Sequence, residues 1–171
     1  NQSRRQRQMC IRDRFNFQQD FEFLPAPFDG MFIALNLTWT DGDSTFKFED
    51  NQSFTTPFRK LSDKQENFSI GYDKGKFDIR LAMNSRGEYL DWLADEESDI
   101  DKVSLQNSRF VAPHEQWDLK ASYEINDNFR LKFEITNIED RPEYYYWGYN
   151  DRLSQYDEYG TSYAIGFTYN N

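Results

Sequence analysis

Polar and apolar residues alternate in segment after segment of this chain, and no other feature constrains its fold as strongly. Between residues 117 and 125 every second residue is apolar, from Trp117 to Ile125, while Asp118 and Lys120 lie between them. Period 2 is the pattern of a β-strand with one apolar and one polar face. The same pattern predicts about seven strands in all, at 15–24, 31–40, 65–73, 76–89, 115–125, 128–137 and 160–169.

Charged residues recur on the polar face of these predicted strands. They include Arg80, Arg130 and Glu134. A charged face repeated on successive strands does not fit the inside of a sandwich core, but it fits the water-filled lumen of a membrane barrel. Aromatic residues make up 18% of the chain although its mean hydropathy is −0.95, which suits strands whose two faces meet different solvents.

The predicted connections alternate strictly in length: short ones fall at 25–30, 73–75 and 126–127, and long ones at 41–64, 91–114 and 139–158. Outer-membrane barrels have short periplasmic turns and long extracellular loops. A soluble sandwich has no reason to sort its loops by end. We therefore predict an all-β, antiparallel up-and-down meander that contacts lipid in the outer membrane of a Gram-negative bacterium.

Residues 1–14 differ in character from the rest of the chain. They carry a net charge of +4, so the remainder of a chain of net charge −10 carries −14. An acidic body argues against nucleic acid as a partner, because phosphate binding needs clusters of Lys and Arg. Residues 1–14 contain no apolar stretch and are therefore not a secretory signal. We predict that 1–14 is a disordered leader or a translation artefact and that 15–171 forms the barrel strands.

No motif for catalysis or metal binding is evident. The chain has no Gly-rich phosphate loop and no nucleophile elbow, and its carboxylates are too dispersed to nominate an acid–base pair. One histidine, His114, cannot form a typical zinc site without cysteine partners. The acidic run at 95–101 lacks the ligand order of an EF-hand. We therefore nominate no catalytic residue and expect no cofactor and no metal site.

Aromatic residues are concentrated in the last long connection. Aromatic faces stack on sugars and on aromatic siderophores, and Arg pairs with anionic groups, so this connection is a candidate site for a small-molecule ligand. An aromatic girdle with loop packing at the membrane interface is the alternative interpretation. The candidate residues are Tyr144, Tyr145, Tyr146, Trp147, Tyr149, Arg152 and Tyr156.

Several segments, taken in order, resemble TonB-dependent outer-membrane receptors, and the resemblance covers 15–171. The segments that carry it are Leu-Pro-Ala-Pro-Phe-Asp-Gly at 24–30, 34–41, Arg-Leu-Ala-Met-Asn-Ser-Arg at 80–86, 88–91, Gln-Trp-Asp-Leu at 116–119, Thr-Asn-Ile-Glu-Asp-Arg-Pro at 136–142, and 155–163.

This resemblance implies the last third of a 22-stranded transmembrane β-barrel, the type whose lumen holds a plug. The implied partners are outer-membrane lipid, the plug domain, the remaining barrel strands and, through an N-terminal part outside this chain, TonB. The implied function is active uptake of a scarce nutrient, such as a ferric siderophore, cobalamin or an oligosaccharide, by movement of the plug. Because this movement is not a chemical reaction, the resemblance also implies no enzymatic activity. Two alternatives stay open: a complete small barrel acting as an adhesin or enzyme, and a soluble β-sandwich that binds carbohydrate.

Overall fold

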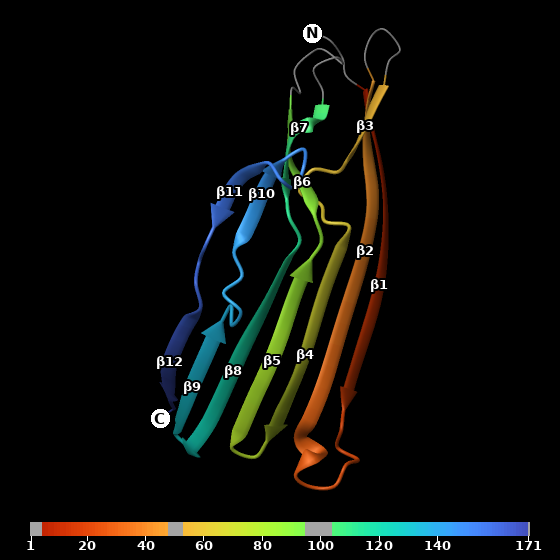
Figure 1. The fold of residues 1–171 in the computed structure, drawn as a ribbon. Helices are drawn as coiled ribbons and strands as arrows, with labels where there is room; N and C mark the ends of the chain where they lie inside the picture. The colour runs from red at the N-terminus through yellow and green to blue at the C-terminus, as the bar shows by residue number, and fades with distance from the viewer. Residues whose placement is uncertain (1–4, 48–52, 95–103, 171) are drawn as a thin grey trace.

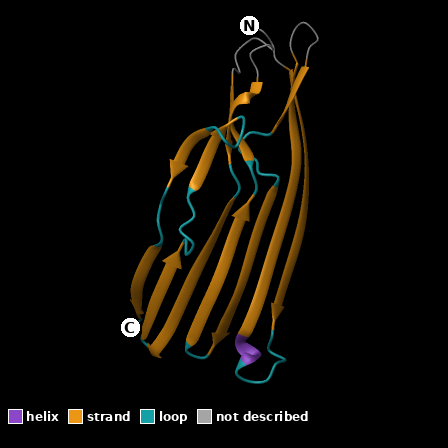
Figure 2. Cartoon of the chain, in the orientation of Figure 1, coloured by secondary structure: helices purple, strands orange, loops and turns teal. Residues whose placement is uncertain are grey.

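The chain is all-β over the residues that the computed structural model describes, which are 5–47, 53–94 and 104–170. The strands form two antiparallel sheets, and one 3₁₀ turn, η1 (Phe28–Gly30), precedes β2 (Figure 2). None of the helices found in these residues has the length and apolar character needed to cross a membrane.

The larger sheet, called sheet A here, confirms the predicted meander. Each of its first six long strands pairs with the next long strand along the chain, and the short β3 (Ser53–Pro57) adds to the far end of β2. Short connections lie at one end of sheet A and long ones at the other (Figure 1). The long strands are, in spatial order, β1 (Arg5–Asp20), β2 (Met31–Lys47), β4 (Lys64–Lys74), β5 (Phe77–Arg86), β8 (His114–Asn126), β9 (Phe129–Thr136) and β12 (Ser162–Tyr169).

The strand register gives sheet A one apolar and one polar face. One row across the strands contains Phe17, Leu35, Phe68, Met83 and Trp117, and the neighbouring row contains Asn16, Asn36, Asn67, Asn84 and Gln116. Because successive side chains of a strand point to opposite faces, these two rows lie on opposite sides of the sheet.

Among the described residues, none forms a packed layer over the apolar face of sheet A. On β12, Tyr163, Ile165 and Phe167 expose 70%, 78% and 71% of their surface, and Phe17 and Phe77 on other strands are also exposed. None of the fully buried apolar side chains among the described residues belongs to sheet A. Membrane barrels have an uncovered apolar face of this kind, because their outward side chains meet lipid.

The smaller sheet, called sheet B here, is built from the long connections. Its order is β11 (Leu153–Asp157), β10 (Glu143–Trp147), β7 (Ser104–Val111) and β6 (Tyr89–Ala94), and it lies at the long-loop end of sheet A (Figure 1). Its buried apolar residues are Leu90, Leu93, Ala94, Val111 and Tyr146. The long connections therefore contain a small hydrophobic core of their own, which the sequence analysis did not predict.

Part of the segment predicted over 1–14 to be a disordered leader or a translation artefact forms a strand. Strand β1 begins at Arg5, and residues 5–14 pair with residues 38–47 of β2. Because β2 continues past residue 40, where the alternation led us to end it, its backbone N–H and C=O groups need partners. Residues 5–14 contain neither proline nor glycine and can supply them. Residues 1–4 lie outside the described residues.

A close approach on the polar face fixes one aromatic side chain. A Cβ atom added to Gly71 would lie 2.5 Å from the ring of Phe32 and 2.5 Å from the backbone oxygen of Ile79. The ring of Phe32 therefore lies directly over the glycine of the neighbouring strand. The guanidinium of Arg80 is 4.9 Å from the centre of that ring, within the range of a cation–π contact.

Asn137 holds the junction between sheet A and the β10–β11 hairpin. It is 6% exposed and adopts a φ of 57°, a conformation that asparagine tolerates better than most residues. Its backbone N–H donates to Asp118 (2.9 Å), and its side-chain oxygen accepts from the N–H of Arg141 (2.9 Å). Its side-chain nitrogen donates to the backbone oxygen of Arg141 (3.2 Å), and its own backbone oxygen accepts from Thr161 (2.9 Å).

Candidate functional site

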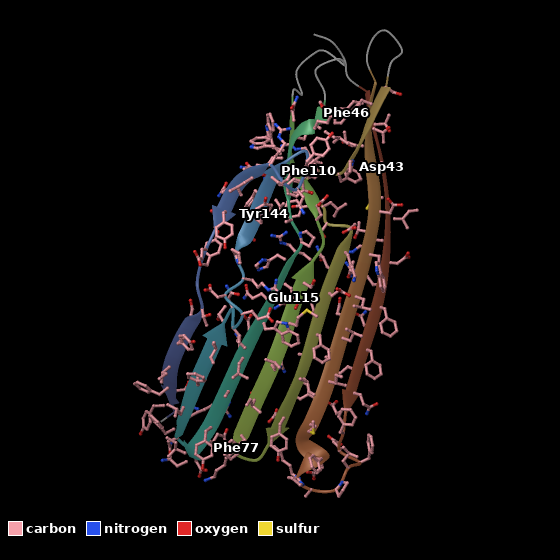
Figure 3. The ribbon with its side chains drawn as sticks, viewed as in Figure 1. Asp43, Phe46, Phe77, Phe110, Glu115 and Tyr144 are labelled. Carbon is pink, nitrogen blue, oxygen red and sulfur yellow. The ribbon has the colours of Figure 1, made fainter. Side chains whose placement is uncertain are left out.

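The predicted aromatic residues lie together in the β10–β11 hairpin of sheet B, but on different faces of it. Strand β10 carries Tyr144 to Trp147, the turn carries Tyr149 and Arg152, and β11 carries Tyr156. Alternation along β10 directs Tyr144 and Tyr146 to one side and Tyr145 and Trp147 to the other. Figure 3 shows Tyr144 and Phe110 at this end of the molecule, far from Phe77 at the other end.

Tyr146 belongs to the core of sheet B. It is 5% exposed, and its ring stacks on that of Phe110 with centroids 5.6 Å apart and planes 15° apart. Its hydroxyl donates to the carboxylate of Glu88, and burial together with this acceptor raises the pKa of Tyr146. The ligand-facing position expected for Tyr146 does not fit this burial, because alternation on β10 directs its side chain inward.

Arg109, on β7, lies beside the other face of the hairpin. Its guanidinium is 5.4 Å from the ring centre of Tyr145, and its Nε donates to Asp91 at 2.7 Å. Arg109 pairs in register with Trp92 on one neighbouring strand and with Trp147 on the other. The rings of these two tryptophans meet edge to face, with centroids 5.8 Å apart. Because Asp91 already neutralises Arg109, this face offers aromatic surface and hydrogen-bonding groups and no uncompensated positive charge at Arg109.

Arg86 joins the end of β5 to the hairpin. It donates to Glu143 (2.9 Å) and to the backbone oxygen of Ala112 (3.0 Å), and its guanidinium is 5.1 Å from the ring centre of Tyr89. Burial opposes the charge of Glu143, but hydrogen bonds from Arg86 and Tyr145 outweigh it and hold the pKa of Glu143 below its ordinary value. Burial and the neighbouring Glu143 raise the pKa of Tyr145 to about 12. These contacts fix the tyrosine and the carboxylate in one network.

The exposed members of the cluster are Tyr149, Arg152 and Tyr156. Half of the surface of each of the two tyrosines is open to solvent. Arg152 is exposed as well, and it donates to the backbone oxygen of Gln106 at 3.1 Å. An aromatic ligand can therefore reach these rings from solvent, whereas Tyr146 is closed to it.

Sequence reasoning did not single out Asp91, Trp92 or Arg109, although they complete this surface. The three residues fall in the connection at 91–114, which has no sustained alternation. Register shifts interrupt β6 between Leu90 and Trp92, so the period-2 signal is lost there. The sequence signal that could have identified this surface was the presence of Trp92 and Arg109 in a polar connection, because both residue types are enriched at binding surfaces.

The described residues, which exclude 1–4, 48–52, 95–103 and 171, contain no group of three or more His, Cys, Asp or Glu side chains placed to hold a metal ion. The acidic run at 95–101 lies outside them. Sheet B therefore offers aromatic stacking and hydrogen bonding as its chemistry.

No family model, no curated protein and no solved structure matches the chain. The function is therefore inferred from the geometry of the chain itself, together with its sequence resemblance.

Proposed function

We propose that this chain is the C-terminal barrel portion of a TonB-dependent outer-membrane receptor and takes part in the active uptake of a scarce nutrient. The exposed apolar face of sheet A carries this proposal. Soluble monomers rarely expose a contiguous apolar patch larger than a few hundred Å². Here apolar side chains form a band across one face of seven paired strands, from the rows near the short turns to the row of Phe17 and Trp117. Lipid is the medium in which such a band is stable.

The opposite face of sheet A suits a water-filled lumen. It carries cross-strand ion pairs, with Lys120 and Glu134 at 2.7 Å and Arg130 paired with Glu124. Both pairs are partly exposed, and such pairs require water or other polar groups around them. A plug domain inside a larger barrel would supply polar groups beside these ion pairs, in the part of the face near the short turns.

The two ends of sheet A support the proposal that further strands complete a barrel. Strands β1 and β12 stand at opposite ends of the strand order, so each has one edge of backbone N–H and C=O groups without a strand partner among the described residues. In the hydrocarbon layer each such group costs several kcal/mol, and membrane barrels avoid this by closing. Closure with the remaining strands of a receptor satisfies both edges, which a small complete barrel would have to do by pairing β1 with β12.

Sheet B is the outward, ligand-facing part in this proposal. A small-molecule ligand would stack on Tyr149 and Tyr156 and place an anionic or hydroxyl group near Arg152. Ferric siderophores, cobalamin and oligosaccharides all offer such groups. The transport step is movement of the plug through TonB, so the chain performs no chemistry.

The chain's four tryptophans allow a direct test of lipid contact. Trp39 and Trp117 lie on the apolar face of sheet A, whereas Trp92 and Trp147 lie in sheet B. Because the edges of β1 and β12 need partner strands in lipid, two double variants, W92F/W147F and W39F/W117F, are made in the receptor that contains this chain, with tryptophans elsewhere in it replaced by phenylalanine. Both are reconstituted into phosphatidylcholine bilayers with and without brominated acyl chains. We expect bromine to quench the fluorescence of W92F/W147F and to leave that of W39F/W117F nearly unchanged.

These two variants are matched controls for each other, because each removes two tryptophans and retains two. Absence of quenching in W92F/W147F would contradict the proposal, since the apolar face would then be covered by protein. A soluble sandwich predicts that result, and it also predicts that the chain folds without detergent or lipid.

A further inference from the structure

A straight row of side-chain carboxamides crosses the polar face of sheet A. The row contains one residue from each of β1, β2, β4, β5 and β8, paired in direct register: Asn16, Asn36, Asn67, Asn84 and Gln116. Neighbouring strands are about 4.8 Å apart, so the row is roughly 19 Å long. Each carboxamide offers two N–H donors and one oxygen acceptor without a net charge. The row therefore places a line of neutral hydrogen-bonding groups on the polar face of sheet A.

A shallow trough lies beside this row. The next row toward the short turns contains Ala34, Ser69 and Ala82, whose side chains are small and leave a low floor. Beyond the floor lies the Phe32–Arg80 contact, which forms the opposite wall. We call this the amide trough.

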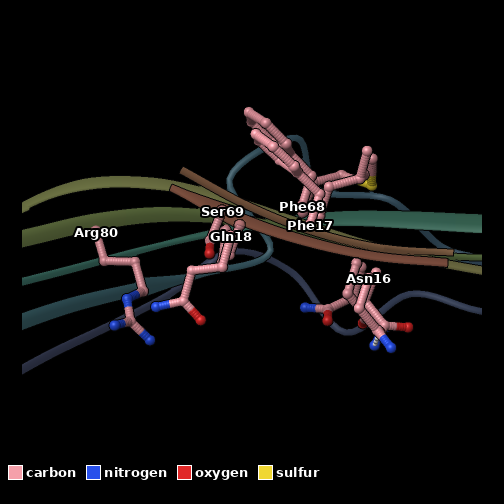
Figure 4. A pocket seen from close by; sticks show the side chains of 13 residues that line it. Asn16, Phe17, Gln18, Phe68, Ser69 and Arg80 are labelled. Atoms are coloured by element: carbon pink, nitrogen blue, oxygen red, sulfur yellow. Dashed lines mark hydrogen bonds between the residues drawn. The ribbon is translucent and has the colours of Figure 1, made fainter. Parts of the chain in front are cut away.

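A depression in the structure coincides with the amide trough, and its polar lining includes Asn16, Gln18, Asn36, Asn67, Ser69, Arg80 and Asn84. In Figure 4 the side chains of Asn16, Gln18 and Arg80 point away from those of Phe17 and Phe68. Phe17, Leu35, Phe68 and Met83, which also line the depression, therefore belong to the other face of the sheet, and the amides are open on their own side.

The two central carboxamides have unused hydrogen-bonding capacity. Asn36 donates to Asn16 at 2.6 Å, and Gln116 donates to Asp118 at 2.8 Å. Asn67 and Asn84 face each other in register, yet within the described part of the chain their side chains make no hydrogen bond. A purely structural asparagine ladder would pair them. Instead, their donors and acceptors are available to a ligand in the trough.

The charge of the trough selects the kind of ligand. Arg80 keeps its positive charge while it lies over Phe32, but it is the single cation among the residues that line the depression. Asp118, at the end of the floor row, carries the opposite charge and accepts from both Gln116 and Asn137. Anionic ligands are bound by clusters of Arg and Lys, which this row lacks. Hydroxyl groups act as donor and acceptor at once and match carboxamides in both roles.

We propose that the amide trough binds an uncharged, hydroxyl-rich chain, an oligosaccharide, laid across the strands. This inference rests on the proposed function, because the trough then faces the lumen, and it selects the oligosaccharide from the three nutrient classes. The length of the row suits several sugar units of an extended glycan, each within reach of one strand's amide.

The test uses the protein in bilayers, with maltohexaose, cellohexaose and xylohexaose as probes and ferric desferrioxamine B and cyanocobalamin as comparison ligands. Isothermal titration calorimetry is expected to show binding of at least one hexasaccharide and of neither comparison ligand. The variant N67A/N84A should bind that hexasaccharide about tenfold or more weakly, because it loses at least two hydrogen bonds. The matched control S122A, on the same face of β8 but outside the trough, should bind it unchanged.

A second variant makes the test independent of hydrogen bonds. A82W places a large side chain on the floor and should abolish binding by filling the trough. Hexasaccharide binding that neither N67A/N84A nor A82W weakens would overturn the inference. Failure of all three hexasaccharides to bind, while lipid still quenches Trp39 and Trp117, would overturn the inference and leave the proposed function in place. Loss of that quenching would overturn both.

Discussion

Leu90 is the residue whose truncation should most clearly reveal the core of sheet B. Its side chain is 1% exposed, and it lies opposite Phe110 in the β6–β7 pair. Its backbone oxygen accepts from Lys60 at 2.7 Å, so the main chain cannot easily move into a cavity. Truncating a buried leucine to alanine costs about 2–5 kcal/mol, and the rigid surroundings lead us to expect about 3 kcal/mol for L90A.

The Trp92–Trp147 contact provides the assay. In a background in which both tryptophans of sheet A are replaced by phenylalanine, fluorescence reports the unfolding of sheet B alone. Urea m-values of small proteins are about 1–3 kcal/mol/M, so a loss of about 3 kcal/mol lowers the urea midpoint by roughly 1–3 M.

Leu153 supplies a control with the same chemistry in the same sheet. It is 58% exposed on β11, and substitutions at such positions usually change stability by less than about 0.5 kcal/mol. We therefore expect L153A to leave the midpoint almost unchanged. Equal shifts for L90A and L153A would refute the reasoning, because they would mean that sheet B has no packed interior.

Three further predictions follow from the geometry. G71A should destabilise sheet A by about 1–3 kcal/mol in urea unfolding, because its new Cβ would meet atoms at 2.5 Å, while G166A, with no atom within 4 Å, should be neutral or slightly stabilising. The difference in ultraviolet absorbance between the parent and Y145F should show that the hydroxyl of Tyr145 ionises at a higher pH than an ordinary tyrosine. Because its pKa is raised, the contribution of Tyr145 to stability is present below pH 10 and is lost as the pH rises toward about 12. E143Q should cost about 1 kcal/mol at neutral pH by breaking the ion pair with Arg86. Because the pKa of Glu143 is lowered, that difference from the parent should shrink as the pH falls below 4.5, and an undiminished difference in acid would contradict the assignment.

The strands of sheet A were predictable because each has two faces in different surroundings. The alternation around Trp117 and around Phe133 reports that difference directly, and both segments are strands with the expected neighbours. The end of β2 was not predictable from alternation, because residues 41–45 carry no large apolar side chain on either face. There, pairing with residues 5–14 and with β3 fixes the strand.

The strands of sheet B were missed for a different physical reason. Strand β10 has a tyrosine at each of three successive positions, so the sequence carries no alternation even though one side is buried. A register shift between Tyr145 and Tyr146 further disturbs the pairing with β11. The position of the aromatic cluster was therefore predictable, but the division between Tyr146 in the core and Tyr149 at the surface depends on the fold.

The partners of this cluster come from remote parts of the chain. Arg109 contacts Tyr145 from a strand more than thirty residues earlier, and Arg86 reaches Glu143 across 57 residues. Such long-range pairing is decided by the order of strands in the sheets. A single sequence contains no local signal for it.

The bonds of Asn137 have a mechanical consequence for the hairpin above it. Its main chain and carboxamide tie Asp118, Arg141 and Thr161 to one point, so the β10–β11 hairpin cannot swivel against sheet A unless several of these bonds break together. An aspartate at this position would lose the N–H donors, and most other residues would resist the left-handed backbone. The hydrogen bonds of this one residue therefore fix the orientation of the β10–β11 hairpin, and with it the orientation of its tyrosines, relative to sheet A.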